Sequence, residues 1–105
     1  MRVEKTPLSF VGSFSIPPDH PCLPGHFPGQ PLVPGALLLD RALDLIAAHE
    51  SGRTLAGPVT VKFLLSVAPG EEVAVHHAPS RLGGSVFEGR IGARLVFTGR
   101  AGAAP

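Results

Sequence analysis

Hydrophobic and polar residues alternate along several stretches of this chain, which is the pattern of strands with one buried face. In the first stretch serines would lie on one face, and the other face would carry Leu8, Phe10, Phe14 and Ile16. The turn residues between stretches, among them Pro69-Gly70 and Gly92-Ala93, are typical of strand connections. The pattern predicts five strands, at 8–16, 58–67, 71–78, 85–91 and 94–100. The tail, 101–105, is expected to be frayed.

Residues 35–49 follow a different pattern, because they are apolar on nearly every side when drawn as a helix. Pro34 fits just before or at the first turn, and Ser51-Gly52 ends the segment. A helix of this kind is buried rather than amphipathic. The preceding stretch, 17–34, holds seven of the twelve prolines and is expected to be an ordered, irregular loop.

One apolar helix needs a sheet to cover it. We therefore predict an α+β fold with an antiparallel sheet wrapped around one long buried central helix, in which the four later strands form a meander. The length of 105 residues indicates a single domain, 1–105. An open sheet leaves its edges unpaired, and pairing two copies edge to edge would cover them.

Composition narrows the class of protein. Hydrophobic residues make up 44% and charged residues 16%, which hints that a second subunit covers some apolar surface. The net charge of +1 without a basic tract gives no support for nucleic-acid binding. A single cysteine, Cys22, rules out an internal disulfide and fits a reducing compartment. The start lacks a signal-peptide pattern and the longest apolar run, 36–39, is too short to span a membrane, so a cytoplasmic protein is expected.

The segment 26–40 places a base, a helix start and an acid close together. It reads His-Phe-Pro-Gly-Gln-Pro-Leu-Val-Pro-Gly from His26 to Gly35, and Asp40 follows fourteen positions after the histidine. This motif, together with Val61-Lys62-Phe63 and Pro69-Gly70-Glu71, resembles the 3-hydroxyacyl-[acyl-carrier-protein] dehydratases of the hotdog fold, the FabZ and FabA type. The likeness covers roughly residues 10–100.

The resemblance implies a hotdog homodimer with active sites at the subunit interface, where His26 comes from one chain and Asp40 from the other. It also implies a substrate carried by acyl-carrier protein, dehydration of a 3-hydroxyacyl thioester to a trans-2-enoyl thioester, and no cofactor. The Leu-Leu-Leu-Asp run ending at Asp40 looks more like the dehydratases of aryl-polyene or xanthomonadin-type pigment pathways than like those of ordinary fatty-acid synthesis.

Each step of such a dehydration can be matched to a residue. His26 would take the C2 proton, because an unperturbed histidine pKa near 6.5 leaves the ring largely neutral at cytoplasmic pH. The N–H of Gly35, at a helix start with no intrahelical partner, would stabilise the thioester oxygen. Asp40 would donate to the leaving hydroxyl, and we expect neighbouring leucines to desolvate it and keep it protonated. The loop around His26 and its substrate contacts would be shaped by Phe27, Pro28 and Gly29.

Other features leave alternatives open. Dehydratases of this type commonly carry Gln where this chain has Asp44, and Asp44 is expected to pair with Arg41 on the same helix face. A hotdog thioesterase, or a non-catalytic hotdog subunit that binds acyl-carrier protein, are the alternative functions. Four apolar residues would either line an acyl tunnel or belong to the plain core: Leu32, Val33, Phe63 and Leu65. No metal site is expected, since the histidines lack ligand spacing and His76 and His77 would point to opposite faces of a strand.

Overall fold

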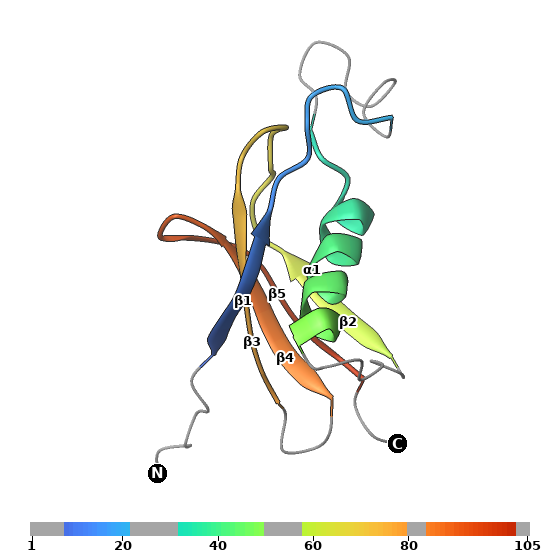
Figure 1. Ribbon diagram of the computed structural model, residues 1–105, viewed down its shortest axis with the longest axis vertical. Helices are drawn as coiled ribbons and strands as arrows, with labels where there is room; N and C mark the ends of the chain where they lie inside the picture. The colour runs from blue at the N-terminus through green and yellow to red at the C-terminus, as the bar shows by residue number, and fades with distance from the viewer. Residues whose placement is uncertain (1–7, 22–31, 50–57, 80–83, 103–105) are drawn as a thin grey trace.

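The computed structural model describes residues 8–21, 32–49, 58–79 and 84–102. One helix, α1 (Gly35–His49), lies across one face of a five-stranded antiparallel sheet (Figure 1). The strands are β1 (Ser9–Phe14), β2 (Val59–Phe63), β3 (Val73–Pro79), β4 (Ser85–Ile91) and β5 (Arg94–Ala101). The predicted α+β fold, with an antiparallel sheet against one central helix, is confirmed, and the helix bounds agree with the apolar segment.

The order of strands in the sheet is β1-β3-β4-β5-β2, which corrects the predicted four-stranded meander. Only β3, β4 and β5 follow one another, while β2 pairs with β5 at the far edge. After β2 the chain leaves the ladder, where the N–H groups of Leu64 and Leu65 both reach the carbonyl of Val96 at 2.7 and 3.3 Å. It then crosses towards β1, and the N–H of Gly70 donates to the carbonyl of Ile16 at 2.8 Å. The nine residues between β2 and β3 therefore form a crossing connection, and β2 ends at Phe63 instead of continuing to Val67.

A bulge in β1 changes which residues face the core. Phe10 pairs with His76 and Gly12 pairs with Val75, so Val11 is an extra residue with no partner of its own. An inserted residue reverses the alternation of faces beyond it. Val11 and Phe14 consequently pack against the core, whereas Phe10 is 56% exposed. The prediction that Phe10 shares the core face was wrong for this reason.

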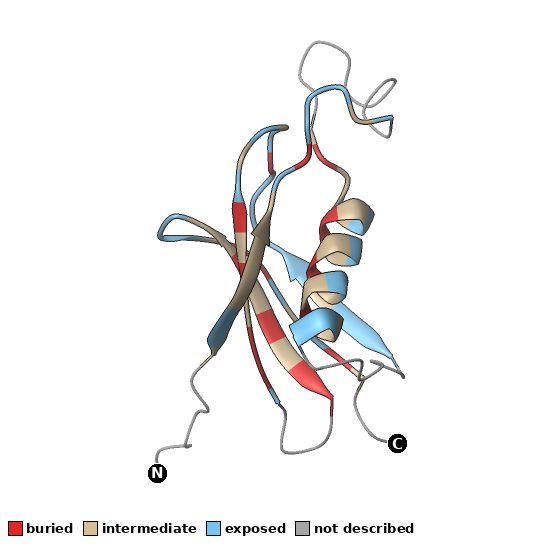
Figure 2. Ribbon diagram, viewed as in Figure 1, coloured by how far each residue is buried: buried red, intermediate tan, exposed pale blue. Residues whose placement is uncertain are grey.

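The helix is buried on one side only. Leu38, Ala42 and Ile46 are at most 2% exposed and belong to the core cluster. The buried parts of the helix lie on its side towards the sheet (Figure 2). The opposite side carries an exposed stripe at four-residue spacing, formed by Ala36, Asp40, Asp44 and Ala48. The prediction of a helix buried all round was wrong for the single chain, because the sheet covers one face and turns away from the other.

Three rings form a row on the helix side of the sheet. The ring centroids of Phe87 and Phe97 lie 6.2 Å apart and those of Phe63 and Phe97 lie 6.1 Å apart, both edge to face. Two of the rings lie over glycines of the neighbouring strands. A Cβ on Gly89 would be 2.3 Å from the Phe97 ring, and a Cβ on Gly99 would be 2.8 Å from the Phe87 ring. These two glycines make the space that the row occupies.

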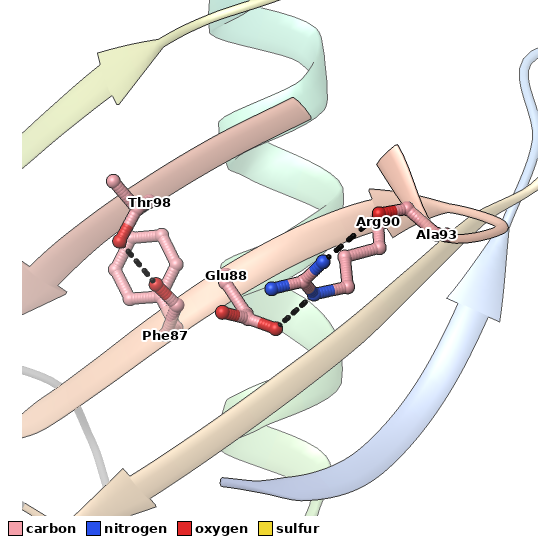
Figure 3. Close-up of polar contacts among 5 residues, drawn as sticks. All are labelled: Phe87, Glu88, Arg90, Ala93 and Thr98. Carbon is pink, nitrogen blue, oxygen red and sulfur yellow. Dashed lines mark hydrogen bonds and ion pairs between the residues drawn. The ribbon is translucent and has the colours of Figure 1, made fainter. Parts of the chain in front are cut away.

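The β4–β5 hairpin also carries polar contacts (Figure 3). The hydroxyl of Thr98 donates to the carbonyl of Phe87 at 3.4 Å, and Arg90 contacts both the Glu88 carboxylate and the Ala93 carbonyl. The hairpin turns at Gly92, whose φ of +61° suits glycine.

The tail expectation needs one correction. Ala101 is the last residue of β5 and is 1% exposed, because its side chain belongs to the core cluster. The strand is held to its end by a hydrogen bond from the N–H of Gly102 to the carbonyl of Pro58, at 3.2 Å. The rest of the predicted tail, 103–105, lies outside the described residues.

Gly89→Ala is expected to lower the free energy of unfolding by about 1–3 kcal/mol, because its methyl group would overlap a ring that is fully buried and has nowhere to move. Urea unfolding measures this loss. The double variant Gly89→Ala/Phe97→Leu should lose less than the two single variants summed, since leucine removes the clash. Strict additivity of the two losses would contradict this explanation.

Candidate active site

The first turn of α1 presents unpaired backbone donors. Pro34 precedes the helix, and its carbonyl accepts from the N–H groups of Leu37 and Leu38 at 3.0 and 3.2 Å. Proline has no side-chain oxygen to cap a helix, unlike the serine or aspartate usual at this position. Within the described residues, the N–H groups of Gly35 and Ala36 have no hydrogen-bond partner. They combine unsatisfied donors with the positive end of the helix dipole.

A hydrogen bond holds this helix start beside the segment that follows β2. The N–H of Val33 donates to the carbonyl of Val67 at 2.8 Å, and both side chains are buried. The residues just before the helix are therefore held against the segment that follows β2. A ligand that uses the free N–H groups would meet a fixed surface.

Beside the helix start lies a largely apolar cavity of about 430 Å³. A volume of this size is within the range of small-molecule sites. The hydroxyl of Ser66 is its one polar side chain among the lining residues. The cavity is lined by residues before the helix, in its first turn and in β2 or just after it: Leu32, Val33, Pro34, Gly35, Leu38, Phe63, Leu65, Ser66 and Val67.

The four residues that the sequence left between tunnel and core all line this cavity. Phe63 and Leu65 are 42% and 43% exposed, so they are cavity wall rather than closed core. Val33 is 6% exposed and also belongs to the core cluster. A helix start with N–H donors next to an apolar cavity suits an acyl group attached to a carbonyl.

Asp40 does not lie where the sequence analysis expected. Its side chain is 64% exposed, so the leucines of the same chain do not desolvate it, and that expectation was wrong for the single chain. In a helix with 3.6 residues per turn, Asp40 is rotated about 200° from Leu38, two residues earlier. Leu38 lines the cavity and Asp40 faces away from it, so the structure does not bring Asp40 to the cavity of its own chain.

Arg41 is paired differently from the prediction. Its guanidinium lies 3.5 Å from the carboxylate of Asp40, in an exposed contact between adjacent residues. Asp44 is exposed and makes no ion pair with Arg41 among the described residues. Surface contacts of this kind contribute little to stability. The Arg41 charge is nonetheless positioned next to the candidate acid.

The remaining predicted site residues, His26, Phe27, Pro28 and Gly29, lie outside the described residues, as does Cys22. Their roles stay predictions. The structure therefore describes the helix start and the acid, but not the candidate base.

Histidines elsewhere show no arrangement for a metal. His77 is 3% exposed and its ring meets that of His49 at 5.4 Å, whereas the ring of neighbouring His76 meets Phe10 at 5.5 Å, so the two adjacent histidines do point to opposite faces. In the ranges that the structure describes, no three histidine, cysteine or acidic side chains are grouped to hold a metal ion. Over the same ranges, no helix has both the length and the apolar character needed to cross a membrane.

The sequence analysis missed Ser66 and Val67 as cavity residues. Both residues fell inside the predicted strand 58–67, where their backbone groups would have paired with a neighbouring strand. The turn residues Pro69-Gly70 were a sign in the sequence that the strand could end before them. The residue at which it ends depends on the tertiary contact of Leu64 and Leu65 with Val96.

The class of protein follows from this architecture: an antiparallel sheet against one central helix, with a cavity at the helix start, is the hotdog fold. Comparison with known proteins then gives the family. A model described as ApeI-like, ApeI dehydratase, matches residues 2–97, and the chain belongs to this family of dehydratases.

Individual relatives agree. The chain is 33% identical over 101 residues to the 3-hydroxyacyl-[acyl-carrier-protein] dehydratase FabZ of Natranaerobius thermophilus, which covers 85% of this chain and 71% of the relative. It is 36% identical over 93 residues to the FabZ of Haemophilus influenzae, covering 78% and 62%. With the FabZ of Acidiphilium cryptum the identity is 29% over 104 residues, covering 89% and 63%. The chain thus spans less than two thirds of two of these relatives. The family resemblance seen in the sequence is confirmed.

Proposed function

We propose that this protein dehydrates 3-hydroxyacyl thioesters carried by acyl-carrier protein to trans-2-enoyl thioesters, in fatty-acid or polyene-type biosynthesis in the cytoplasm. The observation that carries the proposal is the helix start beside an apolar cavity, where the N–H groups of Gly35 and Ala36 have no partner among the described residues. The thioester oxygen gains negative charge when the C2 proton leaves, and fixed donors at that position stabilise it. The family relatives, named as dehydratases of this substrate class, support the same reaction.

The roles of the side chains follow from the chemistry of elimination. His26 takes the proton from C2, the electrons move towards the thioester oxygen held at the helix start, and the carbon–oxygen bond at C3 breaks as Asp40 gives a proton to the departing hydroxyl. Water and the enoyl thioester are the products. No external redox partner is needed, because the electrons of the C–H bond form the new double bond.

We propose further that the working unit is a homodimer with shared sites. Asp40 faces away from the cavity of its own chain, so a catalytic Asp40 has to serve the cavity of a partner. The sheet also ends in β2, an edge strand with β5 as its one neighbour. Two apolar side chains at and after this edge are exposed without lining the cavity, namely Val59 and Leu64. Pairing β2 with its copy would cover the open edge.

Leu64→Lys is expected to weaken this dimer, because a two-fold interface would bury the lysine and its copy without partners, at a cost of several kcal/mol. The dissociation constant should rise about 100-fold or more. Light scattering over a concentration series measures it. Phe10→Lys is the matched control, since Phe10 is an exposed apolar residue on the opposite edge strand. If Phe10→Lys weakens the dimer and Leu64→Lys does not, the dimer interface lies at β1 and not at β2.

The function itself is tested by turnover. Purified protein is mixed with 3-hydroxyacyl thioesters of acyl-carrier protein, with straight chains of four to ten carbons, and the conjugated enoyl product is followed by its absorbance. The expected result is cofactor-free formation of the trans-2-enoyl thioester. A dimeric protein that binds acyl-carrier protein but turns over none of these substrates would instead indicate a non-catalytic hotdog subunit, and release of free acid would indicate a thioesterase.

A further inference from the structure

The ring of Phe63 lies against the helix start. A Cβ built on Gly35 would be 3.0 Å from two atoms at the tip of this ring and 3.3 Å from a third. A methyl group at position 35 would therefore fit only if the ring moved by a few tenths of an ångström. Phe63 comes from β2 and Gly35 from α1, so the contact joins the sheet to the start of the helix at the cavity.

The row of rings prevents Phe63 from withdrawing into the core. Its ring meets Phe97 edge to face at 6.1 Å, and Phe97 is fully buried between Phe63 and Phe87. Phe97 in turn lies directly over Gly89 and has no free space on that side. Phe63 is 42% exposed, so the side of the ring not held by the row faces open space at the cavity. One side of the Phe63 ring is therefore held by Phe97, and the other side is an accessible wall of the cavity.

This position determines which part of an acyl group meets the ring. A thioester oxygen bound by the N–H groups of Gly35 and Ala36 puts its carbonyl carbon at the helix start, within a few ångströms of the Phe63 tip. The carbons that follow, up to about C4, then run along the ring. A straight chain presents one carbon width there. A branch that points between the ring and the helix start adds a methyl group where the ring and the helix backbone already lie close together.

We propose that Phe63 is a specificity-determining residue that excludes acyl groups branched close to the thioester, up to C4, and admits straight ones. The inference rests on the proposed dehydratase function for its substrate, and it goes beyond that function by naming the acyl class and the residue that selects it. One methyl group misplaced in a well-defined pocket changes the specificity ratio by about 10–200-fold.

The test compares 3-hydroxyhexanoyl and 3-hydroxy-4-methylpentanoyl thioesters of acyl-carrier protein, which have the same number of acyl carbons. Wild type is expected to favour the straight substrate in kcat/KM by about tenfold or more. Phe63→Ala and Phe63→Leu should reduce this ratio by about tenfold and about threefold, mainly by raising turnover of the branched substrate. Thermal unfolding confirms that both variants are folded, and the leucine variant keeps the test valid if alanine is not tolerated.

Leu65→Ala is the matched control. Leu65 lines the same cavity with nearly the same exposure, 43% against 42%, but is not among the nearest atoms to Gly35. Its variant should keep the preference for the straight substrate. An unchanged ratio in both Phe63 variants, or an equal loss in Leu65→Ala, would overturn the role of Phe63.

A binding measurement separates this inference from the proposed reaction. Unreactive amide analogues of the two acyl-pantetheines are titrated against wild type and Phe63→Ala by calorimetry. Tighter binding of the straight analogue by wild type, lost in Phe63→Ala, supports the role of Phe63. If this result comes without any turnover, the proposed dehydratase function fails and the role of Phe63 stands. Equal binding of both analogues by a protein that does turn over the straight substrate would overturn the wall alone.

Discussion

Asp40→Asn is expected to lower kcat for 3-hydroxyacyl thioesters by about 10²–10⁴-fold, with the dimer intact. A positioned general acid contributes this much to a proton-transfer step, and asparagine cannot donate an acidic proton to the leaving hydroxyl. The fold should be unaffected, because the side chain is 64% exposed and its contact within the chain is the exposed one with Arg41. Steady-state kinetics on the straight-chain substrates measures the loss.

Asp44→Asn provides the comparison, since Asp44 is one helical turn further along the same exposed stripe and loses the same charge. It should keep kcat within about threefold of wild type, which is the scale of a change in surface charge alone. Equal loss in both variants would mean that helix charge, and not a proton donor, is what the reaction requires.

Mixing two inactive variants is expected to restore activity. His26→Ala should lose activity as Asp40→Asn does, because each removes one half of the proton-transfer pair. If each site takes His26 from one chain and Asp40 from the other, a mixed dimer holds one intact site and one site lacking both groups. Random exchange of equal amounts makes half of all dimers mixed, so about a quarter of wild-type activity should return.

The experiment is made by unfolding and refolding the two variants together, or by co-expressing them with different tags and purifying through both. Refolding each variant alone is the control and should give no recovery. No recovery in a verified mixed dimer would place both groups on one chain, which is contrary to the orientation of Asp40 away from its own cavity.

The sequence predicted the helix and the strands well where local pattern decides the structure. The apolar segment 35–49 became α1 with the same bounds, and Val73 and Val75 face the core with no exposed surface. What it did not predict depends on contacts between distant residues. The β1 bulge at Val11 breaks the alternation that assigned Phe10 to the core, and the place of β2 beside β5 is determined by pairing of strands far apart in the chain.

The candidate site was predicted from the sequence in composition but not in arrangement. The four residues that the sequence left open between tunnel and core line one cavity together with Gly35, whose role as a donor stays a prediction. The exposure of Asp40 was not predicted, since the apolar letters around it suggested burial on every side, whereas one sheet covers only one face of a helix. The periodicity of one chain also says nothing about which helix face a second copy would cover.

The row of rings also restricts how this protein can diverge. Phe87 and Phe97 each need a glycine beneath them, so changing either ring leaves a hole and changing either glycine creates a clash. Phe63 is the one ring of the three with open space beside it. In a lineage accumulating single substitutions, new acyl preferences would therefore arise at position 63 first, while positions 87, 89, 97 and 99 would change together or stay as they are.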